Sequence, residues 1–211
     1  MIQDIPPFIQ ELKLAFDQAL PGRAGHLKMA PFSRKFVDAP DNARQSSTLL
    51  LLFKKEGEWC FPLIQRVGSE HDKHSGQISF PGGSFEANDR SFEFTALRET
   101  EEEIGINKGD VEIIGKLSQT YIPVSNFNIH PYVGFIPSLP QFTIEHAEVA
   151  EVFEFPLHLL NDLSIRKVRD IKVRQMLLRD IPYFEFQEKV IWGATAMMLS
   201  EFADILQKTK L

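Results

Sequence analysis

The stretch from Gly82 to Ile106, GGSFEANDRSFEFTALRETEEEIGI, is the part of this sequence that decides the fold. Carboxylates crowd between Glu99 and Glu103, and a glycine follows at Gly105. A glycine directly after a helical pattern is typical of a helix C-terminus, because glycine adopts a left-handed backbone there at no steric cost. Ser91 is a suitable N-cap at the other end. The pattern therefore predicts a glycine-rich loop followed by a helix from about Ser91 to Ile104.

The carboxylates of this helix have the spacing of a metal site. Glu99, Glu102 and Glu103 are related by steps of three and four residues, so they project from one helical face. Like charges held this close repel each other, and a divalent cation with a preference for oxygen, Mg²⁺ or Mn²⁺, would relieve that repulsion. Arg98 lies one turn from Glu102 and can hold a carboxylate through two hydrogen bonds. A charged run alone is usually a solvated face, the expectation for Glu101.

Two glycines and one arginine upstream of the helix are candidates for phosphate binding. Gly82 and Gly83 allow positive φ and a close approach of the backbone to a phosphate group. Arg66 ends a predicted strand just before this loop, where it could meet a phosphate of a ligand. A plain turn is the alternative for the glycines. We expect all three residues to bind substrate.

Together these residues resemble a known signature, the Nudix box, which reads G-x5-E-x7-R-E-U-x-E-E-x-G-U with U apolar. The pairs Arg98-Glu99, Glu102-Glu103 and Gly105-Ile106 follow it in order. The chain departs from the box at three points. Asp89 takes the place of the first Glu, eight residues instead of seven separate it from the arginine, and Thr100 stands where an aliphatic residue is usual.

The Asp and the extra residue are similar to one branch of the family, the coenzyme A pyrophosphatases. That branch also has an upstream signature resembling L-L-x-x-R…G-x-x-x-F-P-G-G. Here PLIQR ends at Arg66, and GQISFPGG spans Gly76–Gly83. Asp72 stands where the branch usually has a basic residue, with Lys73 beside it. The resemblance covers about residues 44–200.

The resemblance implies the Nudix fold, an α/β (α+β) fold with a mixed β-sheet sandwiched between helices. It implies metal-dependent hydrolysis of a pyrophosphate bond in a nucleoside diphosphate conjugate, above all coenzyme A, to 3′,5′-ADP and 4′-phosphopantetheine. Mg²⁺ or Mn²⁺ held by Glu99, Glu102 and Glu103 would bridge the phosphates and lower the pKa of a bound water. Glu102 is the candidate base as well as a candidate metal ligand. Arg98 and Glu99 complete the catalytic set, and a downstream acid, Glu148, is a further candidate.

Two other functions remain open at this point. The chain could hydrolyse ADP-ribose or another nucleotide conjugate, or it could be a non-catalytic Nudix module that binds a nucleotide. The intact carboxylates disfavour a pure binder, which needs no complete metal cluster. Relatives are commonly dimers, so a homodimer is possible.

Composition limits the kinds of binding partner and the cellular compartment that we expect for this protein. The 211 residues carry a net charge of −6 without a basic run, which disfavours general nucleic-acid binding. No apolar run approaches the roughly 18 residues of a membrane span, and the first residues lack the pattern of a signal peptide. One cysteine, Cys60, suits a reducing compartment, so we expect a cytoplasmic protein. The length suits a single domain over 1–211, with a helical extension over about 1–43.

Hydrophobic periodicity and turn residues predict the remaining elements. Helices are expected at residues 7–20 and 191–206. Strands are expected at 47–55, 59–66, 77–80, 111–119, 129–136, 149–155, 165–178 and 183–186, and residues 21–45 are expected to form a loop.

Overall fold

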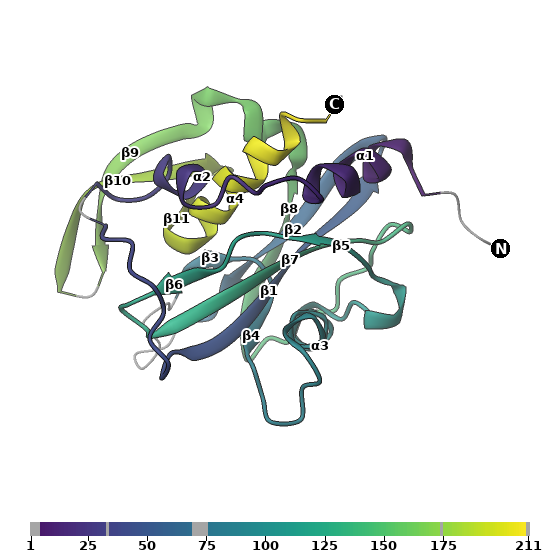
Figure 1. Ribbon diagram of the computed structural model, residues 1–211, viewed down its shortest axis with the longest axis horizontal. Helices are drawn as coiled ribbons and strands as arrows, with labels where there is room; N and C mark the ends of the chain where they lie inside the picture. The colour runs from purple at the N-terminus through teal and green to yellow at the C-terminus, as the bar shows by residue number, and fades with distance from the viewer. Residues whose placement is uncertain (1–4, 33, 69–75, 174, 210–211) are drawn as a thin grey trace.

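A mixed β-sheet forms the centre of the molecule (Figure 1). The structure is a computed structural model that describes residues 5–32, 34–68, 76–173 and 175–209. The long strand β1 (Arg44–Lys55) pairs in parallel with β7 (Phe127–Phe135) and antiparallel with β2 (Glu58–Arg66). Five further strands complete this eight-stranded sheet: β3 (Ile78–Ser79), β4 (Gly82–Ser84), β5 (Glu112–Lys116), β6 (Thr120–Ile122) and β8 (Val149–Pro156).

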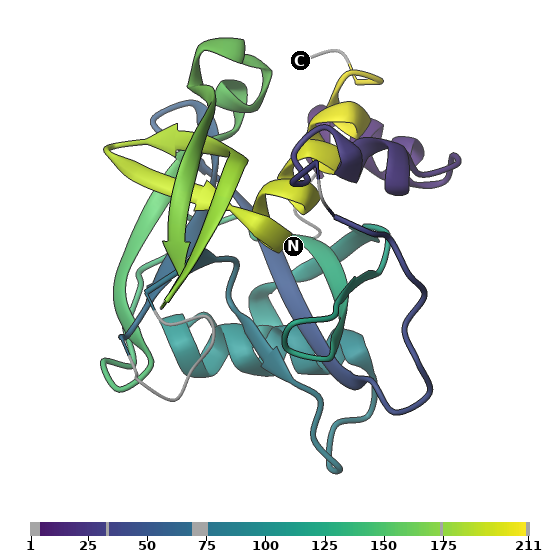
Figure 2. The same ribbon diagram turned by 90° about the vertical axis from the view of Figure 1, so that its left-hand side faces the viewer.

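Both faces of the sheet are covered by helices, which explains the near-continuous apolar sequence of β1. Leu50 and Leu52 pack with the cluster that holds α1 (Pro7–Phe16) and α4 (Gly193–Leu206). Leu49 and Leu51 point the other way, toward α3 (Phe92–Ile104), since side chains alternate along a strand. The short helix α2 (Arg23–Leu27) packs on α4 (Figures 1 and 2). The expected mixed sheet between helices is therefore confirmed.

A second, smaller sheet lies beside α4 (Figure 2). It contains β9 (Arg166–Val173), β10 (Met176–Phe186) and β11 (Lys189–Trp192), all antiparallel. Short 3₁₀ segments connect other elements: η1 (Lys108–Asp110), η2 (Leu157–Asn161) and η3 (Leu163–Ile165). No helix in the described part of the chain is both long enough and apolar enough to cross a membrane.

Several predicted boundaries were wrong. The helix expected over 7–20 ends at Phe16, well before Pro21-Gly22. The loop expected over 21–45 contains α2 and the start of β1. The strand expected over 165–178 is two strands joined by a turn, and that expected over 111–119 stops at Lys116. The last helix starts at Gly193, because the residues up to Trp192 pair with β10. The division into one domain with an extension over 1–43 stays a prediction.

Candidate active site

Helix α3 has the expected ends and an unexpected buried face. Ser91 Oγ accepts a hydrogen bond from Phe94 N at 3.1 Å, and Gly105 adopts φ 73°. Phe94 on this helix is only half-buried. The residues of α3 that are buried are Thr95, Ala96, Thr100, Glu103 and Ile104. Thr100 is tolerated in this face because its hydroxyl donates to Ala96 O at 2.7 Å.

Glu103 is therefore a carboxylate inside the protein, with 1% of its surface exposed. Its Oε2 accepts a hydrogen bond from Gly82 N at 2.8 Å. Its Oε1 lies 3.6 Å from Arg66 Nη1 and has no hydrogen-bond partner among the described residues. Burial raises the pKa of Glu103 to about 8. An unsatisfied buried carboxylate oxygen is costly unless another group completes it.

The two glycines make room for this arrangement. A Cβ at Gly83 would lie 2.5 Å from the carboxylate of Glu99, so any side chain there would displace that glutamate. Gly82 has φ 152°, and a Cβ there would lie 2.3 Å from Ser47 O on β1. Pairing of β4 with β1 thus requires Gly82, and the position of Glu99 requires Gly83. Their predicted role in substrate binding stays a prediction.

Arg98 joins the loop before α3 to the carboxylates on the helix. Its Nε and Nη2 donate to the two oxygens of Asp89 at 2.9 and 3.0 Å. Its Nη1 donates to Glu102 at 2.8 Å and lies 3.0 Å from Glu99 Oε1. These bonds lower the pKa of Asp89 to about 2 and raise that of Arg98 above its usual range. Arg98 also donates to Ser84 O at 3.1 Å, so one guanidinium fixes the loop, the strand and the helix.

Asp89 is the partner of Arg98 that the sequence did not reveal. Its side chain also accepts hydrogen bonds from Thr95 Oγ1 at 2.9 Å and Glu86 N at 3.0 Å. A usable signal was its departure from the box, where Asp replaces Glu and one residue is added before Arg98.

The three box glutamates do not converge on one point. Glu102 lies against Arg98 with 57% of its side chain exposed, whereas Glu103 is buried. Glu148 is close enough to both Glu99 and Glu103 for its negative charge to contribute to raising their pKa values, although burial is the larger cause for each. Glu101, as expected, lies apart and pairs with Lys108.

The chain segment that carries Glu148 is held beside the end of α3. Glu145 N donates to Glu103 O at 3.0 Å, and Glu148 O accepts from Val67 N at 2.8 Å. No three His, Cys, Asp or Glu side chains of the described residues are gathered tightly enough to form a complete metal site. Lys73, a further basic candidate, lies outside the described residues.

The residues present fit a hard divalent cation. The buried, incomplete Oε1 of Glu103, the half-buried Glu99 and the nearby Glu148 supply only carboxylate oxygens, which Mg²⁺ and Mn²⁺ prefer. A cation would complete the buried oxygen and remove the repulsion among the three groups.

Comparison with known proteins decides the family. The pattern of the NUDIX domain matches residues 43–176. The chain belongs to the NUDIX family. Among its relatives are proteins called Nudix hydrolase NudL, themselves uncharacterized. That of Pectobacterium atrosepticum is 36% identical over 148 residues, which cover 68% of this chain and 76% of the relative. That of Photorhabdus laumondii is 32% identical over 170 residues, covering 79% and 87%.

Solved Nudix structures share the fold. A MutT/nudix family protein from Enterococcus faecalis has a TM-score of 0.53 at 16% identity, covering 97% of this chain and 76% of that protein. A MutT protein from Methanosarcina mazei has a TM-score of 0.50 at 16% identity, covering 79% and 96%. At this identity the likeness concerns the fold alone.

Proposed function

We propose that this Nudix protein is a metal-dependent hydrolase of coenzyme A or its derivatives. Family membership makes it a hydrolase of pyrophosphate bonds in nucleotide conjugates. The observation that carries a catalytic site is the buried, incomplete carboxylate of Glu103, held at the Gly82–Gly83 turn beside Glu99 and Glu148. A protein that only binds nucleotides has no need for this costly arrangement.

The choice of coenzyme A rests on the two sequence signatures. The sequence GQISFPGG and the Asp89 spacing resemble the coenzyme A branch. In the structure, Asp89 is the main partner of Arg98, so this departure from the box belongs to the site's framework. ADP-ribose or another nucleotide conjugate is the second candidate, because the same carboxylates would serve either substrate.

In this proposal, the residues of the site have separate roles in metal binding, proton transfer and positioning. Glu99 and Glu103 would hold Mg²⁺ or Mn²⁺, with Glu148 as a third oxygen donor. The bound cation would supply charge for the phosphoryl oxygens and lower the pKa of water. Glu102 is exposed beside Arg98, so it can reach solvent and take a proton from the attacking water. Arg98 positions both Glu99 and Glu102.

Arg66 and the two glycines are proposed to meet the substrate. Arg66 lies at the end of β2 with its guanidinium toward Glu103, at the same turn as Gly82. A cation that binds Glu103 would compete with this ion pair and direct the guanidinium toward phosphate oxygens. The free, buried Cys60 suits a cytoplasmic location, and a homodimer stays a prediction.

Product analysis over a substrate panel tests the proposal. Coenzyme A, 3′-dephospho-coenzyme A and ADP-ribose are each incubated with the protein in Mg²⁺ and in Mn²⁺. We expect coenzyme A to have the highest kcat/KM and to give 3′,5′-ADP and 4′-phosphopantetheine. Faster cleavage of ADP-ribose than of coenzyme A would contradict the proposed substrate but not the proposed hydrolase activity. No cleavage of any conjugate by folded protein would overturn both.

A further inference from the structure

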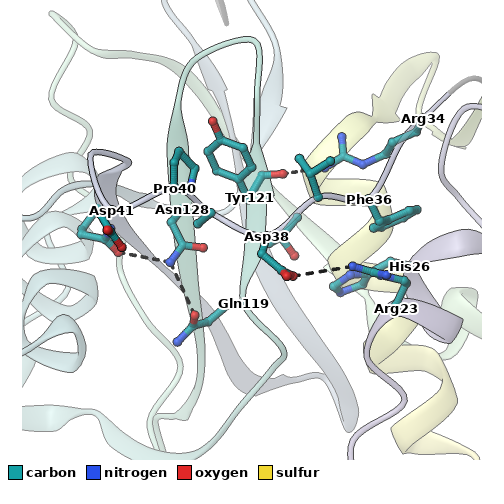
Figure 3. A pocket seen from close by; sticks show the side chains of 14 residues that line it. Arg23, His26, Arg34, Phe36, Asp38, Pro40, Asp41, Gln119, Tyr121 and Asn128 are labelled. Atoms are coloured by element: carbon teal, nitrogen blue, oxygen red, sulfur yellow. Dashed lines mark hydrogen bonds and ion pairs between the residues drawn. The ribbon is translucent and has the colours of Figure 1, made fainter.

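A cavity of about 460 Å³ lies between α2, the N-terminal end of β1 and the β6–β7 pair. Its wall is the segment of residues 34–41, here called the strap, which runs beside the β6–β7 pair (Figure 3). None of the box glutamates lines it. The volume is within the roughly 300–1,000 Å³ of small-ligand pockets.

The strap brings a poorly compensated positive charge into this cavity. The Arg34 side chain is half-buried, and its Nη2 donates to Tyr121 O on β6 at 2.7 Å. Its Nε is buried and has no hydrogen-bond partner among the described residues. Those residues also supply no carboxylate within 4.0 Å of it. Burial lowers the pKa of Arg34, which is the direction expected for a cation removed from water without a counter-charge.

A second arginine faces the same aromatic ring. The guanidinium carbons of Arg23 and Arg34 lie 5.4 and 5.3 Å from the ring centre of Phe36 (Figure 3). Two carboxylates, Asp38 and Asp41, also line the cavity and equal the two arginines in number. Both are exposed, however, whereas Arg34 is half-buried. Asp38 is fully exposed and lies 3.9 Å from Arg23, which is itself 58% exposed, so solvent screens this pair.

Amide side chains form another part of the lining. Asn128 Nδ2 donates to Gln45 Oε1 at 3.2 Å and to Gln119 Oε1 at 3.4 Å. Gln119 is exposed, and its NH₂ group has no described protein partner, so it can donate to a ligand. Tyr121 adds an aromatic ring beside these amides. Guanidinium groups, flat rings and carboxamides together are suited to a phosphate attached to a heterocycle.

We propose that this cavity is a nucleotide-phosphate site separate from the catalytic carboxylates, with Arg34 and Arg23 as the phosphate ligands. The ligand is either a distal phosphate of the conjugate being hydrolysed or a separate nucleotide. Both sources share one chemistry, a phosphorylated nucleoside, and the site does not depend on which pyrophosphate the enzyme cleaves.

Calorimetry with 3′,5′-ADP tests the site, with inorganic phosphate as a second probe. EDTA is present throughout, so metal-dependent binding at the box cannot contribute. We expect saturable binding of 3′,5′-ADP, weakened about tenfold or more by Arg34→Met and by Arg23→Met, which remove a charge-assisted hydrogen bond. Lys35→Met is the matched control, since it removes an exposed cation from the same strap but not from the cavity, and its affinity should stay within about twofold of wild type.

Each outcome of the binding and kinetic measurements either supports or contradicts the proposed site. Absence of saturable binding by folded wild-type protein, or equal affinity of wild type and Arg23→Met, overturns the site. Because Arg23 is mostly exposed, its variant remains informative if Arg34→Met fails to fold. If the Arg23 and Arg34 changes also raise KM for the hydrolysed conjugate, the ligand is the substrate's distal phosphate. If they leave hydrolysis unchanged, it is a separate nucleotide. Failure of the proposed hydrolysis leaves this binding result intact.

Discussion

Glu103 is a buried carboxylate whose pKa is raised to about 8, and this makes the metal-free protein sensitive to pH. The folded-state pKa lies above the unfolded value, so the stability that Glu103 contributes is complete below about pH 4.5 and is lost as pH rises through 8. Glu103→Gln cannot ionise and keeps an oxygen for Gly82 N. In EDTA, we expect this variant to gain about 1–3 kcal/mol of unfolding free energy over wild type between pH 5 and 8.

Urea denaturation at several pH values measures this difference. Glu101→Gln is the matched control on the same helix, because Glu101 is paired with Lys108 outside the site. Addition of Mn²⁺ should then raise the unfolding temperature of wild type and of the control more than that of Glu103→Gln. Parallel pH dependence of wild type and Glu103→Gln would contradict the assignment of an unsatisfied charge.

Glu102 and Glu103 differ in exposure, and their roles should differ too. Glu102→Gln keeps the size of the side chain and its hydrogen bond to Arg98 but removes the proton acceptor. We expect kcat to fall by about 10²-fold or more with little change in unfolding temperature. Steady-state kinetics measures kcat for this variant, for wild type and for Glu101→Gln as the control. Activity within about threefold of wild type would show that Glu102 is neither base nor essential ligand.

Arg98 is expected to act through other side chains. Arg98→Lys keeps the charge but loses the fork that binds both oxygens of Asp89. Glu99 and Glu102 would then lose their shared anchor, so kcat should fall while KM changes little. The KM and kcat of the variant are measured separately with the best substrate of the panel. A large rise in KM at unchanged kcat would assign Arg98 to substrate binding instead.

Helix α2 is joined to α4 by a second buried carboxylate, Glu201. It is fully buried and accepts hydrogen bonds from His26 Nε2 at 2.9 Å, Gly22 N at 2.9 Å and Ser118 Oγ at 2.6 Å. Burial alone would raise the pKa of Glu201, but the bonds from His26 and Ser118 outweigh it and lower the pKa. The lowered pKa means that this stabilisation is present above the ordinary pKa of Glu and is lost as pH falls.

Glu201→Gln should therefore destabilise the contact between these helices. The variant places an NH₂ group, which is a donor, where the surrounding groups also donate hydrogen bonds. We therefore expect the free energy of unfolding to fall by about 2–4 kcal/mol at pH 7, measured by urea denaturation. Asp204→Asn on the same helix is the control, since its ion pair with Lys28 is partly exposed and should contribute less than about 1 kcal/mol. Equal losses from the two variants would contradict a special role for the buried network.

Across the whole molecule, the sequence predicted those structural features that depend on residues close together in the chain. The ends of α3 follow from Ser91 and Gly105, and the central strand follows from a continuous apolar run. The strap cavity and the approach of Glu148 to Glu103 were harder to predict, because they depend on how distant segments pack. The small sheet was predicted in part, by the strands expected at 165–178 and 183–186. Its third strand was missed for the same reason, since the residues before Trp192 become a strand only by pairing with β10.

The central claim is metal-dependent cleavage of a pyrophosphate bond at the box carboxylates. Its most direct test is chromatography of coenzyme A incubated with wild-type protein in Mg²⁺, in Mn²⁺ and in EDTA. We predict equal amounts of 3′,5′-ADP and 4′-phosphopantetheine with either cation, none in EDTA, and a strong reduction in Glu103→Gln. Intact coenzyme A with both cations, or cleavage that persists in EDTA or in folded Glu103→Gln at the wild-type rate, would contradict the account.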